Sequence, residues 1–182
     1  VAPGLELHVS TQASTTNWHT VQMWKELGAT RVVAAREVSL ADLKEMKDHV
    51  DIEIESFVHG SMCISYSGRC LLSNYMTGNR DANRGQCSQS CRWKYSLVES
   101  NRPGEYYPIE EDEHGTYIFN SKDLCLIHRI PDLYEAGIDS LKIEGRMKSV
   151  HYCATVAKVY RTAIDAYLKA VSYTHLRAHE TE

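Results

Sequence analysis

The sequence predicts an α/β fold, a partial (β/α) barrel of the TIM type. Strand patterns alternate with amphipathic helix patterns before residue 60 and again after residue 120, which implies parallel strands with right-handed crossovers. No predicted strand is followed by the Gly-x-Gly-x-x-Gly pattern of dinucleotide-binding folds, which disfavours that class. The 182 residues, 43% of them hydrophobic, are enough for one domain core.

The first sixty residues alternate strand, helix, strand, helix, strand. The helix signals are local: Gly28 ends the first helix, and Ser39 is a plausible N-cap for the second. The five predicted elements are residues 5–10, 15–29, 30–36, 39–50 and 51–60.

Two insertions, at about residues 60–120, interrupt this alternation. Residues 59–91 are too rich in Gly, Asn and Arg for a helix, and we expect a long loop. Residues 93–121 are typical of a β-excursion, with turns at Asn101–Gly104 and near His114. The alternation then resumes, and the expected elements are a helix at 132–137, a strand at 139–145 and a long helix from Ser149 to Ala170.

The last twelve residues, VSYTHLRAHETE, break the helical period without a cap. Val171–Glu180 match, residue for residue, the translation of a common transposase sequencing adapter. We therefore expect residues 1–170 to form the partial barrel and residues 171–182 to be a non-native tail. On this interpretation His175 and His179, although spaced like a helical metal pair, have no functional role.

Net charge and hydropathy argue against two classes of protein, those that coat nucleic acid and those that span a membrane. A net charge of −4 argues against general coating of nucleic acid, although local basic clusters can bind RNA. No apolar run approaches the roughly 18 residues of a membrane span, and no signal peptide is visible. We expect a cytoplasmic protein without a membrane partner.

The predicted strands have one apolar and one ionisable face. In the third strand Ile54 and Val58 share one face, whereas Glu55, Phe57 and His59 share the other. Lys142 lies on the polar face of the last strand. Inward-facing charges are costly unless they are paired, so they usually mark a site; the alternative is the solvated face of an open sheet.

Five cysteines are candidate metal ligands. Cys63, Cys70, Cys87 and Cys91 have the spacing C-x6-C-x16-C-x3-C, and Cys125 follows. Disulfides are disfavoured, because five thiols cannot pair evenly. Structural zinc and an iron–sulfur cluster are about equally compatible with this spacing. Cys153, on the apolar stripe of the last helix, is expected to be a core residue.

The segment ESFVHGSMCISYSGRCLLS resembles the signature of peptidase family U32, the collagenase-like peptidases. The residues RDANRGQCSQSCRWKY, NSKDLCLI and LKIEGRMKS look like further blocks of the same family. The resemblance covers Val1 to Ala170 and implies that this chain is the C-terminal half of the barrel, without roughly its first three strands. The signature positions that match are Glu55, Phe57, Gly60, Ser61, Met62, Cys63, Gly68, Cys70, Leu72 and Ser73.

The resemblance implies an oxygen-independent hydroxylase, closest to the type that makes 5-hydroxyuridine in transfer RNA. It implies a 4Fe-4S cluster, a small dicarboxylate co-substrate such as prephenate, and transfer RNA and a second subunit of the same family as partners. The implied cluster ligands are Cys63, Cys70, Cys87 and Cys125, with Cys91 as an alternative. The peptidase named by the family is disfavoured, because neither a His-Glu-x-x-His helix nor a Gly-x-Ser-x-Gly elbow is present.

Residue roles follow from the strand pattern together with the resemblance. Glu55 and His59 are the predicted catalytic residues, about 13 Å apart along the strand. Glu55 would orient Lys142 or Arg36, and His59 would lie at the barrel mouth beside the cysteines. The predicted substrate-binding residues are Arg36, Arg84, Lys142, Arg146 and Lys148, which could hold a dicarboxylate or RNA phosphate.

Two further expectations remain open. A zinc-stabilised RNA-binding module without catalysis is the competing class to the enzyme. The chain holds about half of a closed barrel, so the isolated 182 residues are expected to show little activity, to expose sheet edges, and to aggregate or dimerise.

Overall fold

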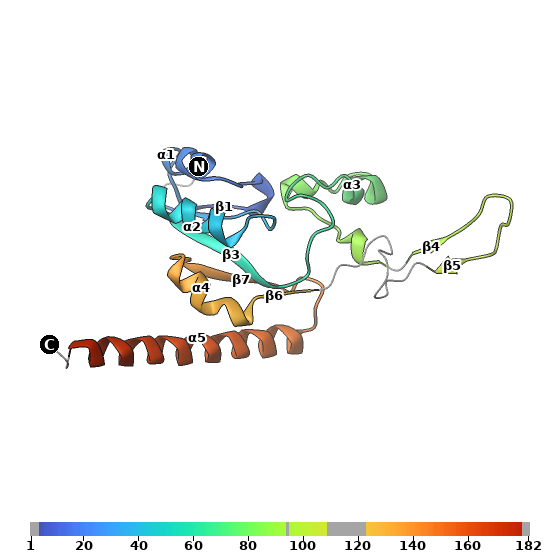
Figure 1. Ribbon diagram of the computed structural model, residues 1–182. Coiled ribbons are helices and arrows are strands. Elements are labelled where there is room, and N and C mark those ends of the chain that lie inside the picture. Colours follow the sequence, from blue (N-terminus) through green and yellow to red (C-terminus); the bar gives the residue numbers. More distant parts are fainter. Residues whose placement is uncertain (1–3, 94, 109–122, 180–182) are drawn as a thin grey trace.

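A computed structural model describes residues 4–93, 95–108 and 123–179 (Figure 1). The chain is a mixed α/β protein, as predicted. Its strands are β1 (Leu7–Val9), β2 (Ala29–Val33), β3 (Glu53–Gly60), β4 (Ser96–Leu97), β5 (Tyr107–Pro108), β6 (Leu124–Cys125) and β7 (Ser140–Glu144). Its α-helices are α1 (Trp18–Glu26), α2 (Leu40–His49), α3 (Leu72–Thr77), α4 (Ile130–Glu135) and α5 (Val150–His179).

Five strands form the main sheet. β1, β2, β3 and β7 are parallel neighbours in that order, with pairs such as Arg31–Glu53 and Glu55–Ser140 in register. β6 pairs antiparallel with the end of β3, where Cys125 lies opposite His59. Parallel strands joined by helices confirm the α/β prediction, although the described strands form an open sheet and close no barrel.

Local signals fix the helix ends: Gly28 and Ser39 act as predicted, whereas α1 begins three residues later than expected, after the N-cap Asn17. Asn17 caps α1 by accepting a hydrogen bond from the Thr20 N–H, and Gly28 adopts the left-handed conformation after the helix. Ser39 and Asp42 form a reciprocal capping box at α2. These contacts satisfy backbone groups that each helix leaves unpaired at its ends.

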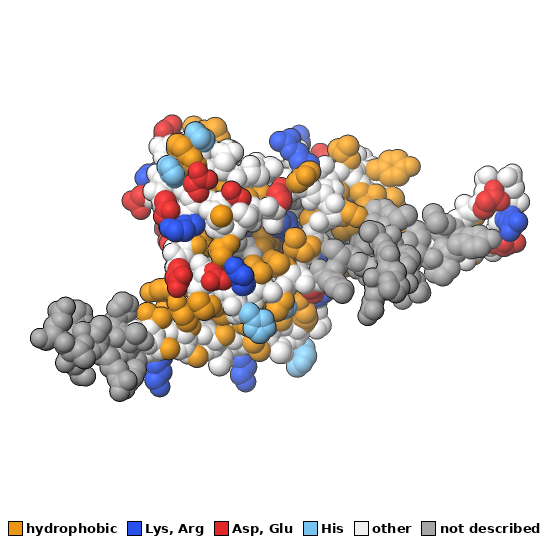
Figure 2. All heavy atoms as spheres, viewed as in Figure 1, with side chains coloured by type: hydrophobic (Ala, Val, Ile, Leu, Met, Phe, Trp, Pro, Cys, Tyr) orange, Lys and Arg blue, Asp and Glu red, His pale blue; other side chains and the backbone are white. Residues whose placement is uncertain are grey.

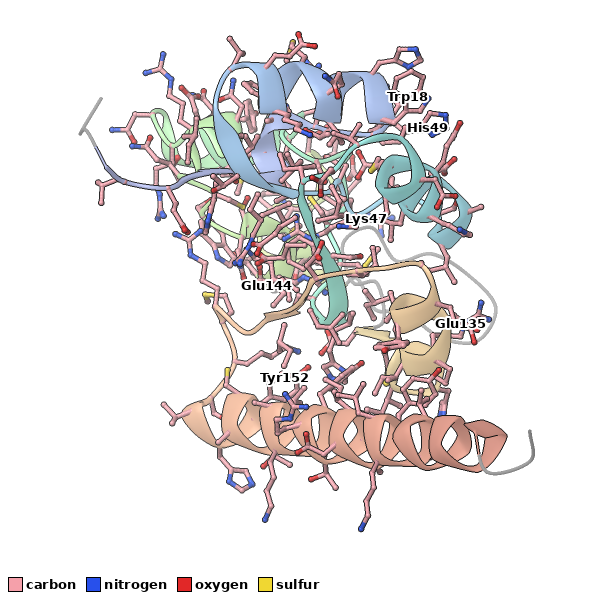
Figure 3. The ribbon with its side chains drawn as sticks, turned by 90° about the vertical axis from the view of Figure 1, so that its left-hand side faces the viewer. Trp18, Lys47, His49, Glu135, Glu144 and Tyr152 are labelled. Carbon is pink, nitrogen blue, oxygen red and sulfur yellow. The ribbon has the colours of Figure 1, made fainter. Side chains whose placement is uncertain are left out.

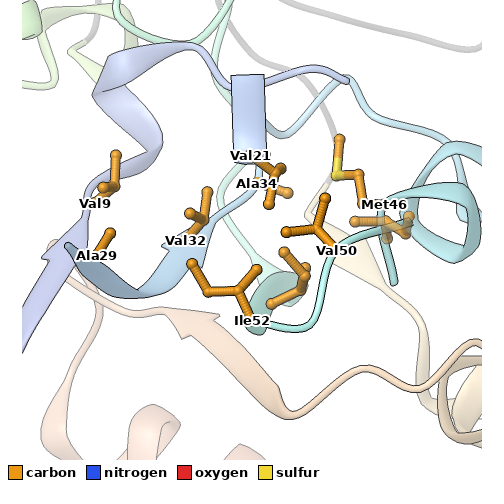
Figure 4. Close-up of a cluster of buried hydrophobic side chains, with 10 residues drawn as sticks. Val9, Val21, Ala29, Val32, Ala34, Met46, Val50 and Ile52 are labelled. Carbon is orange, nitrogen blue, oxygen red and sulfur yellow. The ribbon is translucent and has the colours of Figure 1, made fainter. Parts of the chain in front are cut away.

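Two apolar clusters hold the helices to the sheet. The first joins α1 and α2 to β1, β2 and the start of β3, with Val21, Val32, Met46 and Ile54 fully buried (Figure 4). The second packs α4 and α5 on the other end of the sheet around Val58 and Tyr160 (Figure 1). Residues of β3 belong to both clusters, so this strand lies at the centre of the hydrophobic packing.

The cysteine-rich segment is not the helix-free loop that we expected. It contains the six-residue helix α3 and two 3-10 turns, Ala82–Arg84 and Ser90–Arg92. β4 and β5 form an antiparallel hairpin around the predicted turn at Asn101–Gly104 and extend away from the sheet (Figure 1). The turn expected near His114 lies outside the described residues.

The last helix, α5, continues beyond Ala170 to His179. Its backbone is therefore helical across most of the segment that matches a sequencing adapter. Helical backbone does not test whether that segment is native, so the assignment of residues 171–182 stays a prediction. Among the described helices, none combines the length and the hydropathy that a membrane crossing requires.

Candidate cysteine-lined site

A cavity of about 220 Å³ lies where the parallel strands end. Ser10–Gln12 follow β1, Arg36 follows β2, Ser61–Cys63 follow β3 and Arg146 follows β7, and all of these residues line the cavity. Parallel strands place their carboxyl ends at one edge of a sheet, which is where α/β proteins build their sites.

Four cysteines line this cavity: Cys63, Cys70, Cys87 and Cys91. Burial raises the pKa of the Cys63 thiol, and neighbouring cysteines raise it further, against the lowering effect of the Arg36 charge. Burial likewise raises the pKa of Cys91, with contributions from the other three thiols. Cys63 and Cys91 thus each lie near other thiols of the same cavity.

Thiolates are common metal ligands, and these four cysteines line the same cavity. In the described part of the chain, however, no three His, Cys, Asp or Glu side chains are close enough to form a ready-made metal site. Both raised pKa values mean that binding a metal here must displace thiol protons, so binding would depend on pH. Four thiols are a donor set that a 4Fe-4S cluster or a structural zinc ion can use, but these four side chains would have to come closer together to share one metal centre.

Cys125 is separated from the other predicted ligands. It lies in β6, is exposed, and does not line the cavity. Its strand nevertheless pairs with His59 and Gly60, immediately before the segment that carries Cys63. The structure thus brings Cys91, the alternative ligand, into the cavity and leaves Cys125 at its border.

Three of the five predicted substrate-binding residues also line the cavity: Arg36, Lys142 and Arg146. The Arg36 guanidinium stacks over the Phe57 ring, 4.0 Å from its centroid, and contacts Glu144 at 3.3 Å. Among the described side chains, Arg36 Nε and Gln89 Oε1 are buried at this cavity without a hydrogen-bond partner. Buried polar atoms without partners are rare, and here they indicate room for a polar ligand.

Glu55 holds Lys142 from the neighbouring strand, as the strand pattern predicted. The Lys142 Nζ donates to Glu55 Oε1 at 2.7 Å, and the Ser140 hydroxyl donates to Oε2 at 2.8 Å. Burial alone would raise the pKa of Glu55, but these bonds and the charges of Lys142 and Arg31 outweigh it, so the pKa is lowered. Glu55 itself does not line the cavity, and its contacts make it a residue that positions Lys142.

The His59 ring does not face the way the strand pattern predicted. The β3–β7 register shifts between Phe57 and His59, so Val58 is an inserted residue. A one-residue shift reverses the face of the residues that follow it. The His59 ring packs against Tyr160 and Tyr152 of α5, with centroids 5.6 and 5.9 Å away, and does not line the cavity. His59 lies next to the carboxyl end of β3, as predicted, but its ring faces α5 instead of the cavity, and its catalytic role stays a prediction.

Lys148 and Arg84 also lie outside the cavity. Lys148 forms a 2.7 Å ion pair with Asp123, which also accepts a hydrogen bond from the Tyr152 hydroxyl. Burial raises the pKa of Tyr152 to about 12, with a further contribution from Asp123. Figure 3 shows Tyr152 projecting from α5 toward the sheet. Arg84 is exposed beside Asp81, 3.8 Å away.

Comparison with known proteins decides the family. The model of Peptidase family U32 matches residues 1–181. The chain belongs to this family. Curated U32 relatives include tRNA hydroxylation protein P1 of Bacillus subtilis, 58% identical over 92% of this chain and 39% of the relative. No solved structure gave a significant match.

Two further relatives of the U32 chain carry RNA in their names. The tRNA hydroxylation protein P of Escherichia coli is 43% identical over 90% of this chain and 45% of its own length. A 23S rRNA 5-hydroxycytidine synthase of the same organism is 35% identical over 92% of this chain and 24% of its own length. The chain thus spans less than half the length of these relatives.

Sequence reasoning assigned no role to several residues at the site of this U32 protein. Gln12, Gln89 and Glu144 line the cavity, and Arg92 also lines it and donates to the Met62 carbonyl. Gln12 and Glu144 could have been found, because each lies at the carboxyl end of a predicted parallel strand. Gln89 gives no comparable signal, because its place depends on a left-handed backbone conformation within the loop.

Proposed function

We propose that this chain is part of an RNA-modifying hydroxylase that carries an iron–sulfur cluster and hydroxylates a uridine of transfer RNA at carbon 5. The observation that carries the proposal is one cavity lined by four cysteines and by the cationic side chains of Arg36, Lys142 and Arg146. The names of the RNA-hydroxylating relatives support the reaction class.

A 4Fe-4S cluster, when bound, would supply redox or Lewis-acid chemistry beside the substrate. Cys63, Cys70 and Cys87 would hold it. The fourth ligand is Cys125 if the β6 end moves toward the cavity, and Cys91 if it does not. Separate Cys91→Ser and Cys125→Ser variants distinguish these two, because only loss of the true ligand should lower the iron content.

The small co-substrate is proposed to be a dicarboxylate of the prephenate type, which would supply the transferred hydroxyl group in place of molecular oxygen. Arg36 and Arg146 would bind its carboxylates, since guanidinium groups match carboxylate geometry. The unpartnered Nε of Arg36 is one donor that such a ligand would satisfy. Lys142, held by Glu55, would place a second cation at the same ligand.

Transfer RNA is the proposed macromolecular partner, and the cysteine-rich segment its contact. Residues 61–93 contain four arginines and one acidic residue, in a chain whose net charge is −4. Tyr75 is 83% exposed and Tyr66 72%, and Figure 2 shows hydrophobic and basic side chains together over α3. Exposed aromatic rings beside arginines suit unpaired bases and their phosphates, which gives Arg84 its proposed role.

The sheet is proposed to be part of a (β/α) barrel. Four parallel strands with their site at the carboxyl edge match half of such a barrel. The unpaired edges of β1 and β7 would then be covered by strands of a longer chain or of a second U32 subunit.

The function is tested in a bacterial strain that lacks its own uridine hydroxylase of this type. The strain receives the full-length protein containing this chain, and 5-hydroxyuridine in its transfer RNA is measured by mass spectrometry. We expect the unaltered protein and the α5 surface variant Lys158→Ala to restore the modification, and Lys142→Ala to lower it by roughly tenfold or more. Absence of 5-hydroxyuridine with the unaltered protein would contradict the proposal.

A further inference from the structure

The cysteine-rich segment is fastened to the sheet at Ser67, between Cys63 and Cys70. Ser67 is fully buried, although the residues around it are part of an exposed loop. Its hydroxyl accepts a hydrogen bond from the backbone N–H of Arg36, at 3.1 Å, immediately after β2. A loop residue buried this completely is held by specific bonds, because burying its polar groups without partners would be costly.

Glu37 supplies the acceptors that complete this attachment. Its Oε1 accepts from the Ser67 N–H at 3.1 Å, and its Oε2 accepts from the Ser67 hydroxyl at 3.0 Å. One carboxylate therefore satisfies both the backbone and the side-chain donor of the same loop residue. Hydrogen bonds to an ionised acceptor are stronger than neutral ones.

Thr11 and Gly68 also pack closely at this attachment point. The Thr11 hydroxyl lies 3.1 Å from the Ala34 carbonyl and 3.4 Å from the Ser67 hydroxyl; its single proton favours the shorter contact. Gly68 has φ +72°, and a Cβ there would collide with the backbone carbonyl of Gln12. The loop thus lies directly on the residues that follow β1 and β2.

We propose that Glu37 is a positioning residue for the cysteine site. It fixes Ser67 against the ends of β1 and β2 and thereby holds Cys63 and Cys70, four residues before and three residues after it, at one cavity. Glu37 does not line that cavity. It acts through the loop backbone, and its absence should leave the strands and helices in place.

This inference rests on the proposed function in one respect: Cys63 and Cys70, which Glu37 positions, would be ligands of the proposed cluster. The test therefore uses the reduced, metal-free chain, so that it can succeed or fail independently of cluster binding and hydroxylation. Alkylation rates of Cys63 and Cys70 are measured by mass spectrometry in dilute protein. Cys153, whose thiol lies on α5 at 3.7 Å from the Gly145 carbonyl, is the internal reference.

Glu37→Ala is expected to raise the alkylation rates of Cys63 and Cys70 by roughly tenfold relative to Cys153. Ser67→Ala, which removes only the hydroxyl bonds, should raise them less. Glu37→Gln, which keeps one carbonyl acceptor, should partly restore the unaltered rates. Glu26→Gln on the surface of α1, where Glu26 accepts from Gln22, is the matched control and should change none of them.

Either of two results would overturn the proposal. Unchanged rates at Cys63 and Cys70 in Glu37→Ala would show that the carboxylate does not hold the loop. A parallel rise at Cys153 would show that Glu37 serves the stability of the whole fold.

Discussion

At the residue scale, the pair formed by Glu55 and Lys142 makes stability depend on pH in a defined direction. The pKa of Glu55 is lowered from its ordinary value of 4.5 in the folded chain. The ionised carboxylate therefore stabilises the fold above that value, and the contribution is lost as the pH falls through the lowered folded pKa. Asp123, whose pKa is also lowered, adds an acid-sensitive contribution of the same sign.

Glu55→Gln should lower the free energy of unfolding by about 1–2 kcal/mol at neutral pH, because a charge-assisted bond is replaced by a neutral one. The difference between the two proteins should shrink as the pH falls from about 4.5 toward the lowered folded pKa of Glu55, because the unfolded chain takes up a proton there before the folded chain does. Urea unfolding across this range measures both effects, and Asp123 cancels because both proteins contain it. A difference that stays constant with pH would show that Glu55 acts by packing.

His59 and Glu55 show which residue contacts the sequence can predict. The Glu55–Lys142 contact follows from strand period and adjacency, and it is confirmed at 2.7 Å. The place of His59 depends on the inserted Val58, whose carbonyl accepts from the Tyr160 hydroxyl at 2.7 Å, 102 residues away along the chain. No local sequence pattern indicates that hydrogen bond. The rule that strand side chains alternate between two faces therefore fails at Val58, one residue before His59.

At the element scale, β3 and its exit determine the geometry of the site. Elements with strong periodicity and side-chain caps, such as α1 and α2, were predictable. α3 has no side-chain cap, and β6 is two residues long, so neither gives a local signal. α3 contacts the 3-10 turn Ser90–Arg92, and β6 pairs with β3. Because such distant contacts leave no local pattern, the segment around the cysteines was predicted as a long loop.

A substitution at Gly60, the last residue of β3, tests how closely β3 and β7 approach each other at the site. It has φ +103°, and a Cβ there would collide with the Glu144 carbonyl at the end of β7. Gly60→Ala should destabilise the fold by about 3 kcal/mol or more. Gly78→Ala, with φ +77° but nothing within 4 Å of the added Cβ, carries only the conformational cost of about 1 kcal/mol. Equal losses in thermal or urea unfolding would mean that the collision is relieved by movement of β7.

At the scale of the whole molecule, the sheet leaves two edges uncovered among the described residues. β1 pairs with β2 alone and β7 with β3 alone, and Leu5 and Leu7 are 76% and 47% exposed beside the first edge. Unpaired parallel edges with apolar side chains promote association. The described strands form an open sheet, so the partial (β/α) barrel stays a prediction.

The isolated chain should therefore self-associate as its concentration rises. Sedimentation equilibrium over a range of about a hundredfold in concentration should give an average mass that increases above 20.7 kDa. A proline at the β1 edge, in the variant Leu7→Pro, should reduce this association, because it blocks strand pairing. A monomer at every concentration, with a cooperative melt, would contradict both the edge argument and the barrel proposal.

We propose above that the cysteine-lined cavity holds an iron–sulfur cluster, and the metal content of the chain tests this proposal without any measurement of activity. The chain is purified without oxygen, and its iron, acid-labile sulfide and zinc are measured together with its visible absorption. We predict about four iron atoms and four sulfides per chain, retained in Cys153→Ser and lost in Cys63→Ser. A colourless protein that contains zinc and no sulfide, with zinc lost in the same Cys63→Ser variant, would contradict the cluster and favour the zinc-stabilised RNA-binding module.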